Sequence, residues 1–264
     1  MFRIYDARAG RVADVGPGPG GLLRLYARGP APQRPMDAGE LRTLLVADLI
    51  RRNAEHRHGL TVLASLVVPD AGGDGGAPGA DGTALNIKPA EQTAVASELT
   101  GSAVGELEPG EIVIEAQLGP AGVAVRHSVR VAGARGAPEA PLSALAEGGL
   151  DPLAARLALM SFRHAEQATL TWDVLADADR ALGRWRELVA EWAESPSKPM
   201  CAEVTAQVTA AFDDDLDTPA ALRALRGLEN DPQIPPGSKF ESFLRADQLL
   251  ALDLPREIGR PRRG

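Results

Sequence analysis

Cysteine is almost absent from this chain, which contains a single one, Cys201. One cysteine excludes an intramolecular disulfide and any metal site built mainly from thiolates. The four histidines are scattered, and no two have the i, i+4 spacing of a helical metal or base pair. We therefore expect Cys201 to be a small core or boundary residue and each histidine to be a surface side chain.

Aromatic residues and lysines are also few. Aromatics make up 4% of the residues, so we expect a core of Leu, Val and Ala that includes Trp172 and Trp185. Lysine accounts for only three of the 28 basic residues, and the net charge is −8 with a pI near 5.1. This balance argues against strong sequence-independent binding to nucleic acid, which depends on an excess of Lys and Arg. DNA is not expected as a partner, although a local basic face is still compatible with the composition.

Long apolar runs are missing too. The chain has no stretch of about 18 apolar residues and no charged-then-apolar signal segment at its N-terminus. From the sequence alone we therefore expect a soluble, cytoplasmic protein with no membrane partner.

Hydrophobic residues nevertheless make up 44% of the chain, and their first clear pattern is strand, helix, strand. Residues 22–26 form a short apolar strand pattern, and residues 42–58 have an apolar stripe at helical spacing. Residues 60–68 are almost continuously apolar, which is typical of a buried parallel strand. Asp37 and Glu40 have the spacing of a capping box before this helix. The order is typical of the first half of a Rossmann-like nucleotide-binding fold, whose phosphate loop lies at such a junction.

Alternating patterns predict further strands. Residues 2–15 alternate loosely and predict a hairpin. Residues 111–117 and 123–131 predict two strands joined by a turn at 118–122.

From residue 149 onward the pattern is helical. Asp151 with Pro152, and Asp217 with Pro219, each have the form of a helix start. We expect the acidic run that precedes Pro219 to interact with the helix dipole rather than with a metal.

A family resemblance rests on two blocks of the chain. Residues 22–52 match the pattern Y-x-C-G-P-T-x-x-x-x-x-H-I-G-H-A-R-T-Y-V-x-x-D-x-[IL]-x-R without a gap at Tyr26, Gly29, Pro30, Gly39, Arg42, Thr43, Asp48, Arg51 and Arg52. The second block matches at Asp151, Pro152, Arg156, Leu157, Leu159, Trp172, Leu175, Ala178, Leu182, Arg184 and Trp185, and residues 213–219 (DDDLDTP) resemble a [MA]-D-D-D-[FL]-[ND]-T-P junction. The chain thus resembles class I cysteinyl-tRNA synthetase and the related cysteine ligase of mycothiol synthesis.

The resemblance implies an α/β, Rossmann-like fold of the class I aminoacyl-tRNA synthetase type, followed by a C-terminal α-helical domain. In these terms residues 1–148 are a shortened catalytic-domain remnant with an N-terminal ribbon, and residues 149–264 are a helical stem-contact or bundle region. Residues 85–101 resemble a helical segment of the family.

The resemblance also implies that the family's chemistry has changed in this chain. The H-I-G-H tetrad falls on Asp-Ala-Gly-Glu at residues 37–40, and three zinc-ligand positions fall on Arg28, Pro89 and Thr93. The segment that corresponds to K-M-S-K-S, near residues 129–135, contains no lysine. We therefore predict that the zinc and ATP sites are lost, and that the chain has no cofactor, no metal site and no catalytic residue.

Three functions are compatible with this pattern. We favour a catalytically degenerate paralogue that acts as a binding or regulatory protein without cysteine adenylation. A second hypothesis is a re-purposed ATP-dependent ligase or aminoacyl transferase, because arginines can replace histidines as phosphate donors. A third is a protein that interacts with tRNA or with a synthetase. Whether the chain is an enzyme is left open.

Two sets of residues belong to these hypotheses. A remnant cleft for a small-molecule ligand would be lined by Arg28, Gly29, Pro30, Asp37, Gly39, Glu40 and Arg42. Contacts to tRNA would come from Arg57, Arg163, Arg180, Arg184 and Arg186. The alternative for the second set is a salt-bridged helix surface, since acidic residues are interleaved throughout.

Overall fold

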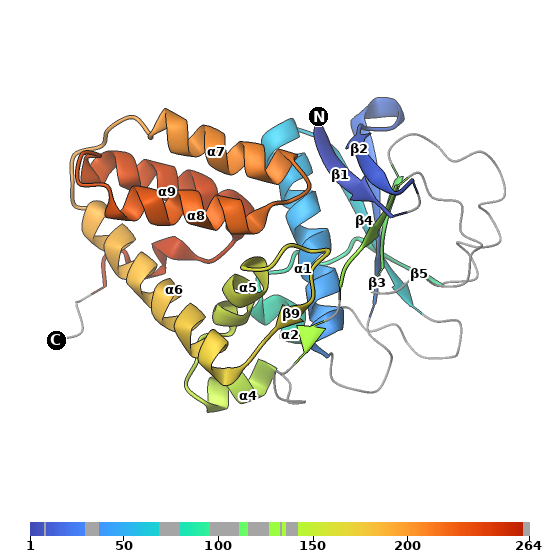
Figure 1. The fold of residues 1–264 in the computed structure, drawn as a ribbon, viewed down its shortest axis with the longest axis horizontal. Helices are drawn as coiled ribbons and strands as arrows, with labels where there is room; N and C mark the ends of the chain where they lie inside the picture. Colours follow the sequence, from blue (N-terminus) through green and yellow to red (C-terminus); the bar gives the residue numbers. More distant parts are fainter. Residues whose placement is uncertain are drawn as a thin grey trace.

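The computed structural model describes residues 1–7, 9–29, 37–68, 80–95, 111–115, 127–132, 134–135 and 142–260. Helix α1 stands between a parallel sheet and a group of helices formed by the later part of the chain (Figure 1). A short two-stranded ribbon from the N-terminus lies beside the sheet (Figure 1).

The N-terminal ribbon is the predicted hairpin of β1 (Phe2–Asp6) and β2 (Arg11–Val15). At its turn the backbone N–H of Gly10 donates to the carbonyl oxygen of Asp6 over 2.8 Å. Gly10 has a φ of +64°, a conformation that a residue without a Cβ adopts without strain. Phe2 and Ile4 are completely buried, so one face of the ribbon packs against the rest of the molecule.

The main sheet has five strands, all parallel, in the order β5-β4-β3-β6-β7. Their bounds are β3 Leu22–Arg28, β4 Thr61–Val68, β5 Gln92–Val95, β6 Glu111–Glu115 and β7 His127–Arg130. The first of these strands along the chain, β3, is central, and the chain extends the sheet first on one side of β3 and then on the other. The predicted α/β class with a parallel sheet is confirmed, and the strand order is compatible with a Rossmann-like fold.

Two predictions about this sheet are wrong. β6 and β7 are parallel neighbours, with Ile112 opposite His127, so they do not form the hairpin that a turn between them implies; the predicted turn at residues 118–122 lies outside the described residues. Residues 92–95, which lie in the segment that resembles a family helix, form β5 and pair with β4. Two of its four residues, Thr93 and Val95, are β-branched, which favours a strand.

Helix α1 (Ala38–Arg52) follows β3 and continues into one π-helical segment, η2 (Asn53–Arg57). It begins four residues before the predicted residue 42, because Asp37 caps it. Every residue from Leu41 to Ile50 is buried, since the sheet covers one side of α1 and the later helices cover the other (Figure 1).

Several short elements complete the first part of the chain. They are the 3-10 turn η1 (Pro19–Gly21), the helices α2 (Ala80–Ala84) and α4 (Leu142–Glu147), and the strand β8 (Ala134–Arg135), which pairs with β9 (Ala168–Thr169).

The later part of the chain is helical, as predicted. Its helices are α5 Pro152–Met160, α6 Trp172–Trp192, α7 Ala202–Asp213, α8 Thr218–Asn230 and α9 Pro236–Leu250, followed by the 3-10 turn η3 Leu254–Glu257. The two predicted helix starts are confirmed: Asp151 accepts from the N–H of Leu153, and Asp217 accepts from the N–H of Ala220.

The two tryptophans expected in the core differ in their exposure to solvent. Trp185 is buried and packs in a T-shaped arrangement with the Phe243 ring at a centroid distance of 5.5 Å. Trp172 is 48% exposed, because it is the first residue of α6 and lies on the helix's solvent side.

Buried apolar residues from the sheet, α1 and the later helices form one continuous cluster in the described part of the chain. The predicted boundary between residues 148 and 149 therefore stays a prediction. No helix that the structure describes is both long enough and apolar enough to span a bilayer.

Candidate functional site

The candidate site begins where β3 ends, at the carboxyl edge of the sheet. Arg28, the last residue of β3, is exposed, and its side chain makes no hydrogen bond or ion pair with any part of the chain that the structure describes. The N–H of Gly29 donates to the carbonyl oxygen of Val67 over 2.8 Å. A Cβ at Gly29 would lie 2.9 Å from the side chain of the buried Leu66, so a larger residue at this position would have to displace Leu66. Pro30 lies outside the described residues.

The N-terminus of α1 carries the predicted capping box, which is confirmed. The N–H of Glu40 donates to Oδ1 of Asp37 over 2.9 Å, and the N–H of Asp37 donates to Oε2 of Glu40 over 3.0 Å. Gly39 lies between them, and a Cβ there would be 3.2 Å from Oδ1 of Asp37. A helix N-terminus after a central strand is a natural anion site, but here two carboxylates already accept from its backbone and oppose a second anion.

Arg42 has a different environment from the rest of the predicted cleft. Its guanidinium is buried and donates to the carbonyl oxygens of Ala132 (2.8 Å), Arg163 (2.6 Å) and Glu166 (2.5 Å). Burial lowers the pKa of Arg42 to about 10, although the Glu166 carboxylate raises it. The side chain thus connects α1 to the loop before β9 and could meet a ligand only by leaving these carbonyls.

The residues at the family's zinc positions do not fit zinc. They are Arg28, Pro89 and Thr93, and none offers the thiolate, imidazole or carboxylate that a tetrahedral zinc site needs. In the part of the chain that the structure describes, no group of three or more His, Cys, Asp or Glu side chains is placed to hold a metal ion.

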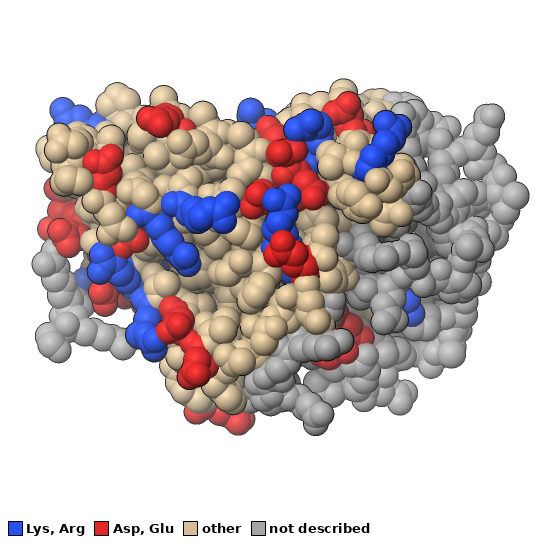
Figure 2. All heavy atoms as spheres, viewed as in Figure 1, with Lys and Arg blue, Asp and Glu red and all other residues tan. Residues whose placement is uncertain are grey.

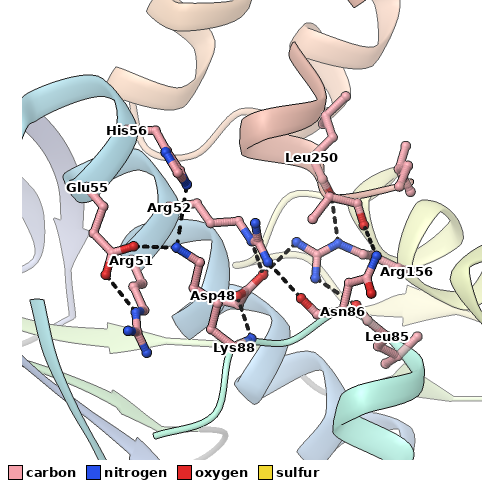
Figure 3. Close-up of polar contacts among 12 residues, drawn as sticks. Asp48, Arg51, Arg52, Glu55, His56, Leu85, Asn86, Lys88, Arg156 and Leu250 are labelled. Atoms are coloured by element: carbon pink, nitrogen blue, oxygen red, sulfur yellow. Dashed lines mark hydrogen bonds and ion pairs between the residues drawn. The ribbon is translucent and has the colours of Figure 1, made fainter. Parts of the chain in front are cut away.

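A buried network around Asp48 was not predicted from the sequence (Figure 3). Oδ2 of Asp48 accepts from Arg156 (2.7 Å) and Arg52 (2.8 Å), and Oδ1 accepts from the N–H of Lys88 (2.9 Å). Arg156 is fully buried and also donates to the carbonyl oxygens of Leu85 and Leu250. Burial alone would raise the pKa of Asp48, but Arg156 and Arg52 outweigh it, so the pKa is lowered. The network joins α1, α5, α9 and the segment after α2.

The same network continues towards the surface through Lys88 and Glu55. Arg51 pairs with Glu55 over 2.8 Å and with Glu91 over 2.5 Å, while Lys88 also pairs with Glu55 over 2.5 Å. Glu91 in turn accepts from the N–H of Ala64 in β4. These charges connect α1 to the segment between α2 and β5.

A second set of contacts converges on the DDDLDTP junction between α7 and α8. The ribbon reaches it through Arg3, which pairs with Asp214 over 2.8 Å, and through the N–H of Tyr5, which donates to Asp215 over 2.7 Å. Asp215 also lies 3.0 Å from Nε2 of His164. Burial would raise the pKa of Asp215, but His164, Tyr5 and Arg163 lower it below its usual value.

Two further contacts add to this convergence. His58 lies 2.7 Å from Asp213, and Arg163 pairs with Asp217 over 2.7 Å. The acidic run thus does more than interact with a helix dipole: it joins the ribbon, the end of α1 and the loop after α5 to the helices.

The five arginines considered for tRNA are all in ion pairs. The pairs are Arg57–Asp213, Arg163–Asp217, Arg180–Asp177, Arg184–Glu229 and Arg186–Asp151. This is the arrangement that the salt-bridged alternative expects, and contact with tRNA stays a prediction.

Comparison with characterised proteins gives partial matches. No family model matches the chain. A ligase of Mycolicibacterium smegmatis, L-cysteine:1D-myo-inositol 2-amino-2-deoxy-α-D-glucopyranoside ligase, is 38% identical over 117 residues, which cover 43% of this chain and 27% of that protein. Ligases of the same name from Streptomyces griseus and Salinispora tropica are 40% identical over 84 residues and 35% identical over 122 residues, or 20% and 28% of their own lengths.

The matched stretches therefore span about a quarter of these relatives, and the chain is shorter than they are. These ligases belong to the family that the sequence motifs resemble. The chain is a homologue, over part of its length, of the cysteine ligases that make mycothiol and are related to cysteinyl-tRNA synthetase.

Proposed function

We propose that this protein is a catalytically degenerate relative of the mycothiol cysteine ligases, with a class I synthetase type of fold, and that it binds or regulates rather than activates cysteine. The observation that carries the proposal is the capping box of Asp37 and Glu40. It occupies the position at which the family has its histidine tetrad.

The distribution of matching residues supports the proposal. The family residues that this chain keeps are used to hold the fold: Asp48, Arg52 and Arg156 form the buried network, and Arg42 binds three backbone carbonyls. The positions that differ are those at which the family binds ATP and zinc. Such a division is expected when the fold is maintained after the chemistry has been lost.

Electrostatics supports it as well. Adenylation requires donors that stabilise the charge developing on the triphosphate, and the loss of one such donor typically costs about 10²–10³ in rate. Here the histidines are replaced by two carboxylates, which repel a triphosphate at the same helix terminus.

Calorimetric titration with the non-hydrolysable analogue cysteinyl-sulfamoyl-adenosine tests the proposal. We expect no heat of binding to this protein, while the M. smegmatis ligase, as the matched positive control, binds it. A one-to-one titration with an affinity close to that of the control would contradict the proposal.

A re-purposed ligase or transferase is the second candidate, and Arg28 is the observation in its favour. This exposed arginine at the end of β3 is free of described partners, so its guanidinium could meet a phosphate. An ATP-consuming activity that Arg28→Ala abolishes, with an unchanged melting temperature, would establish this candidate. Arg42 is unsuitable for the same test, because removing its buried side chain leaves three backbone carbonyls without this donor and would affect the fold itself.

Binding to tRNA or to a synthetase is a third proposal. All five arginines that would make the contact have acidic partners in the structure, so we rank it below the other two.

A further inference from the structure

A group of basic side chains lies just beyond the C-terminal end of α1. His56, in the π-helical segment η2, is exposed, and its Nε2 lies 3.5 Å from Nζ of Lys88. Figure 3 shows Lys88 extending towards both His56 and Glu55. Helix α9 lies next to η2 and brings the positive charge of Arg245 to the same place. The name His56 cluster is used below for Arg52, Glu55, His56, Lys88 and Arg245.

Positive charge exceeds negative charge in the His56 cluster. Partial burial lowers the pKa of His56 below its usual value, and the positive charges of three neighbours lower it further. These neighbours are Lys88, Arg52 and Arg245, and the carboxylate of Glu55 opposes them. The C-terminal end of α1 adds only about half a negative charge. Three cations therefore face about one and a half negative charges.

The carboxylate of the His56 cluster is shared, and one of its cations is unpaired. Glu55 accepts from Lys88 over 2.5 Å and from Arg51 over 2.8 Å, so it neutralises neither of them fully. Arg245 donates to the neutral side chain of Gln248 and pairs with no acidic side chain in the part of the chain that the structure describes.

The buried network holds the donors of the cluster in place. Asp48 accepts from the N–H of Lys88 and from the side chains of both Arg52 and Arg156. Arg52 also donates from Nη2 to the carbonyl oxygen of Asn86 over 2.8 Å, while its Nη1 has no partner among the described residues. A ligand at this position would therefore meet donors that are already oriented, which lowers the entropic cost of binding.

Two further observations favour a bound anion here. The net charge of the chain is −8, and other parts of its surface carry one-to-one pairs such as Arg3–Asp214 and Arg180–Asp177. Figure 2 shows basic and acidic side chains next to one another on the ribbon and on the helices. The second observation is the geometry of η2, since π-helical turns are rare and occur frequently at functional sites.

We propose that the His56 cluster binds the dianionic phosphate group of a small ligand, either free inorganic phosphate or a phosphate monoester. Lys88 and Arg52 donate to the phosphate oxygens, and His56 donates as well once the anion has favoured its protonation. A dianion suits the cluster better than chloride or a carboxylate, because two charges are needed to offset an excess of about one and a half.

This site is distinct from the end of β3. It lies at the C-terminal end of α1, whereas the capping box lies at the N-terminal end, roughly 22 Å away for a helix of 15 residues. Phosphate binding at the His56 cluster is therefore independent of the lost adenylation.

Histidine ring signals in proton–carbon NMR spectra of the full chain test the proposal. The chain has four histidines, and His56→Asn identifies the signals of His56. We expect inorganic phosphate, exchanged for chloride at constant ionic strength, to shift these signals saturably and to raise the pKa of His56, because an anion favours the imidazolium. The signals of His164, which pairs with Asp215, are the internal control and should not shift.

Two further probes define the ligand. Glycerol 3-phosphate is a monoester and is mostly dianionic at neutral pH, since its second pKa is about 6. Dimethyl phosphate is a diester with a single charge, and we expect it to bind about tenfold more weakly than either dianion. Tighter binding of glycerol 3-phosphate than of inorganic phosphate would assign the site to a monoester, the reverse would assign it to the free ion, and both results support the proposal.

Variants locate the binding. Lys88→Met should weaken phosphate binding by about tenfold or more, because it removes a charged donor. Arg245→Met should weaken it by about two- to threefold through the lost positive charge, and it breaks no ion pair of the described structure. Arg180→Met is the matched control, since it removes an exposed arginine of α6, and it should leave phosphate binding unchanged.

Several outcomes would overturn the proposal. They are ring signals of His56 that do not respond to phosphate, equal shifts of His56 and His164, and binding of dimethyl phosphate as tight as that of the dianions. Phosphate binding that survives unchanged in both Lys88→Met and Arg245→Met would also overturn it.

Discussion

Buried arginines connect distant segments of this chain. Arg42, Arg156 and Arg186 are each buried, and each donates to two or more backbone carbonyl oxygens. Arg156 and Arg186 also pair with an aspartate, Asp48 and Asp151 respectively. A guanidinium suits this position because its five N–H donors are held in one plane and can reach several acceptors at once.

Arg156→Met tests the importance of this arrangement. The substitution leaves Asp48 buried without its closest partner, so we expect the free energy of unfolding to fall by roughly 3–5 kcal/mol, measured by urea denaturation. Arg180→Met removes an exposed pair with Asp177 and should change it by less than about 1 kcal/mol. Equal effects of the two substitutions would show that the buried network does not stabilise the fold.

The pH dependence of stability follows from the lowered pKa of Asp48. A carboxyl whose pKa is lower in the folded state stabilises that state fully above its unfolded pKa, near 3.8, and loses this contribution as the pH falls through the folded value. We therefore expect the free energy of unfolding to decrease from about pH 4 downward.

Asp48→Asn is the comparison for this prediction. Its curve should be lower at neutral pH and flatter below about pH 4, and urea denaturation across the acid range measures both. Some slope should persist, because the pKa values of Asp151 and Asp215 are lowered too. A variant with the same slope as the unchanged chain would contradict the assignment.

At the scale of elements, local sequence predicted helix starts well and strand direction poorly. The caps at Asp37, Asp151 and Asp217 depend on residues within one turn, so their spacing alone identifies them. Alternation identified the strands that became β6 and β7, but carries no information about their direction. β5 was missed because its pairing with β4 is a tertiary contact.

Asp37→Ala tests the energetic contribution of the capping box. The substitution removes the acceptor for the N–H of Glu40, so we expect the free energy of unfolding to decrease by about 1 kcal/mol. Asp37→Asn, which retains an acceptor oxygen, should be close to neutral in the same urea denaturation. If Asp37→Ala had no effect on stability, the cap would contribute nothing to α1.

For the whole molecule, long-range contacts show which of the family's matching residues hold the fold together and which remain at the candidate site. Asp48 and Arg156 lie 108 residues apart in the chain, so no local pattern could predict that they meet. Both residues match the family pattern, and this match was the only indication of their importance in the sequence. The sequence alone could not show whether they bind a ligand or stabilise the fold. The structure places them in the core, together with Arg42, and leaves Arg28, Asp37 and Glu40 at the carboxyl edge of the sheet.

The most direct test of the account is cysteine-dependent exchange of pyrophosphate into ATP, because this reaction reports adenylation itself. The M. smegmatis ligase serves as the positive control at the same enzyme concentration. The account predicts exchange at the background level for this protein, with cysteine and ATP saturating for the control. Exchange that depends on cysteine and approaches the rate of the control would contradict it, and would mean that two carboxylates at the start of α1 are compatible with activation of ATP.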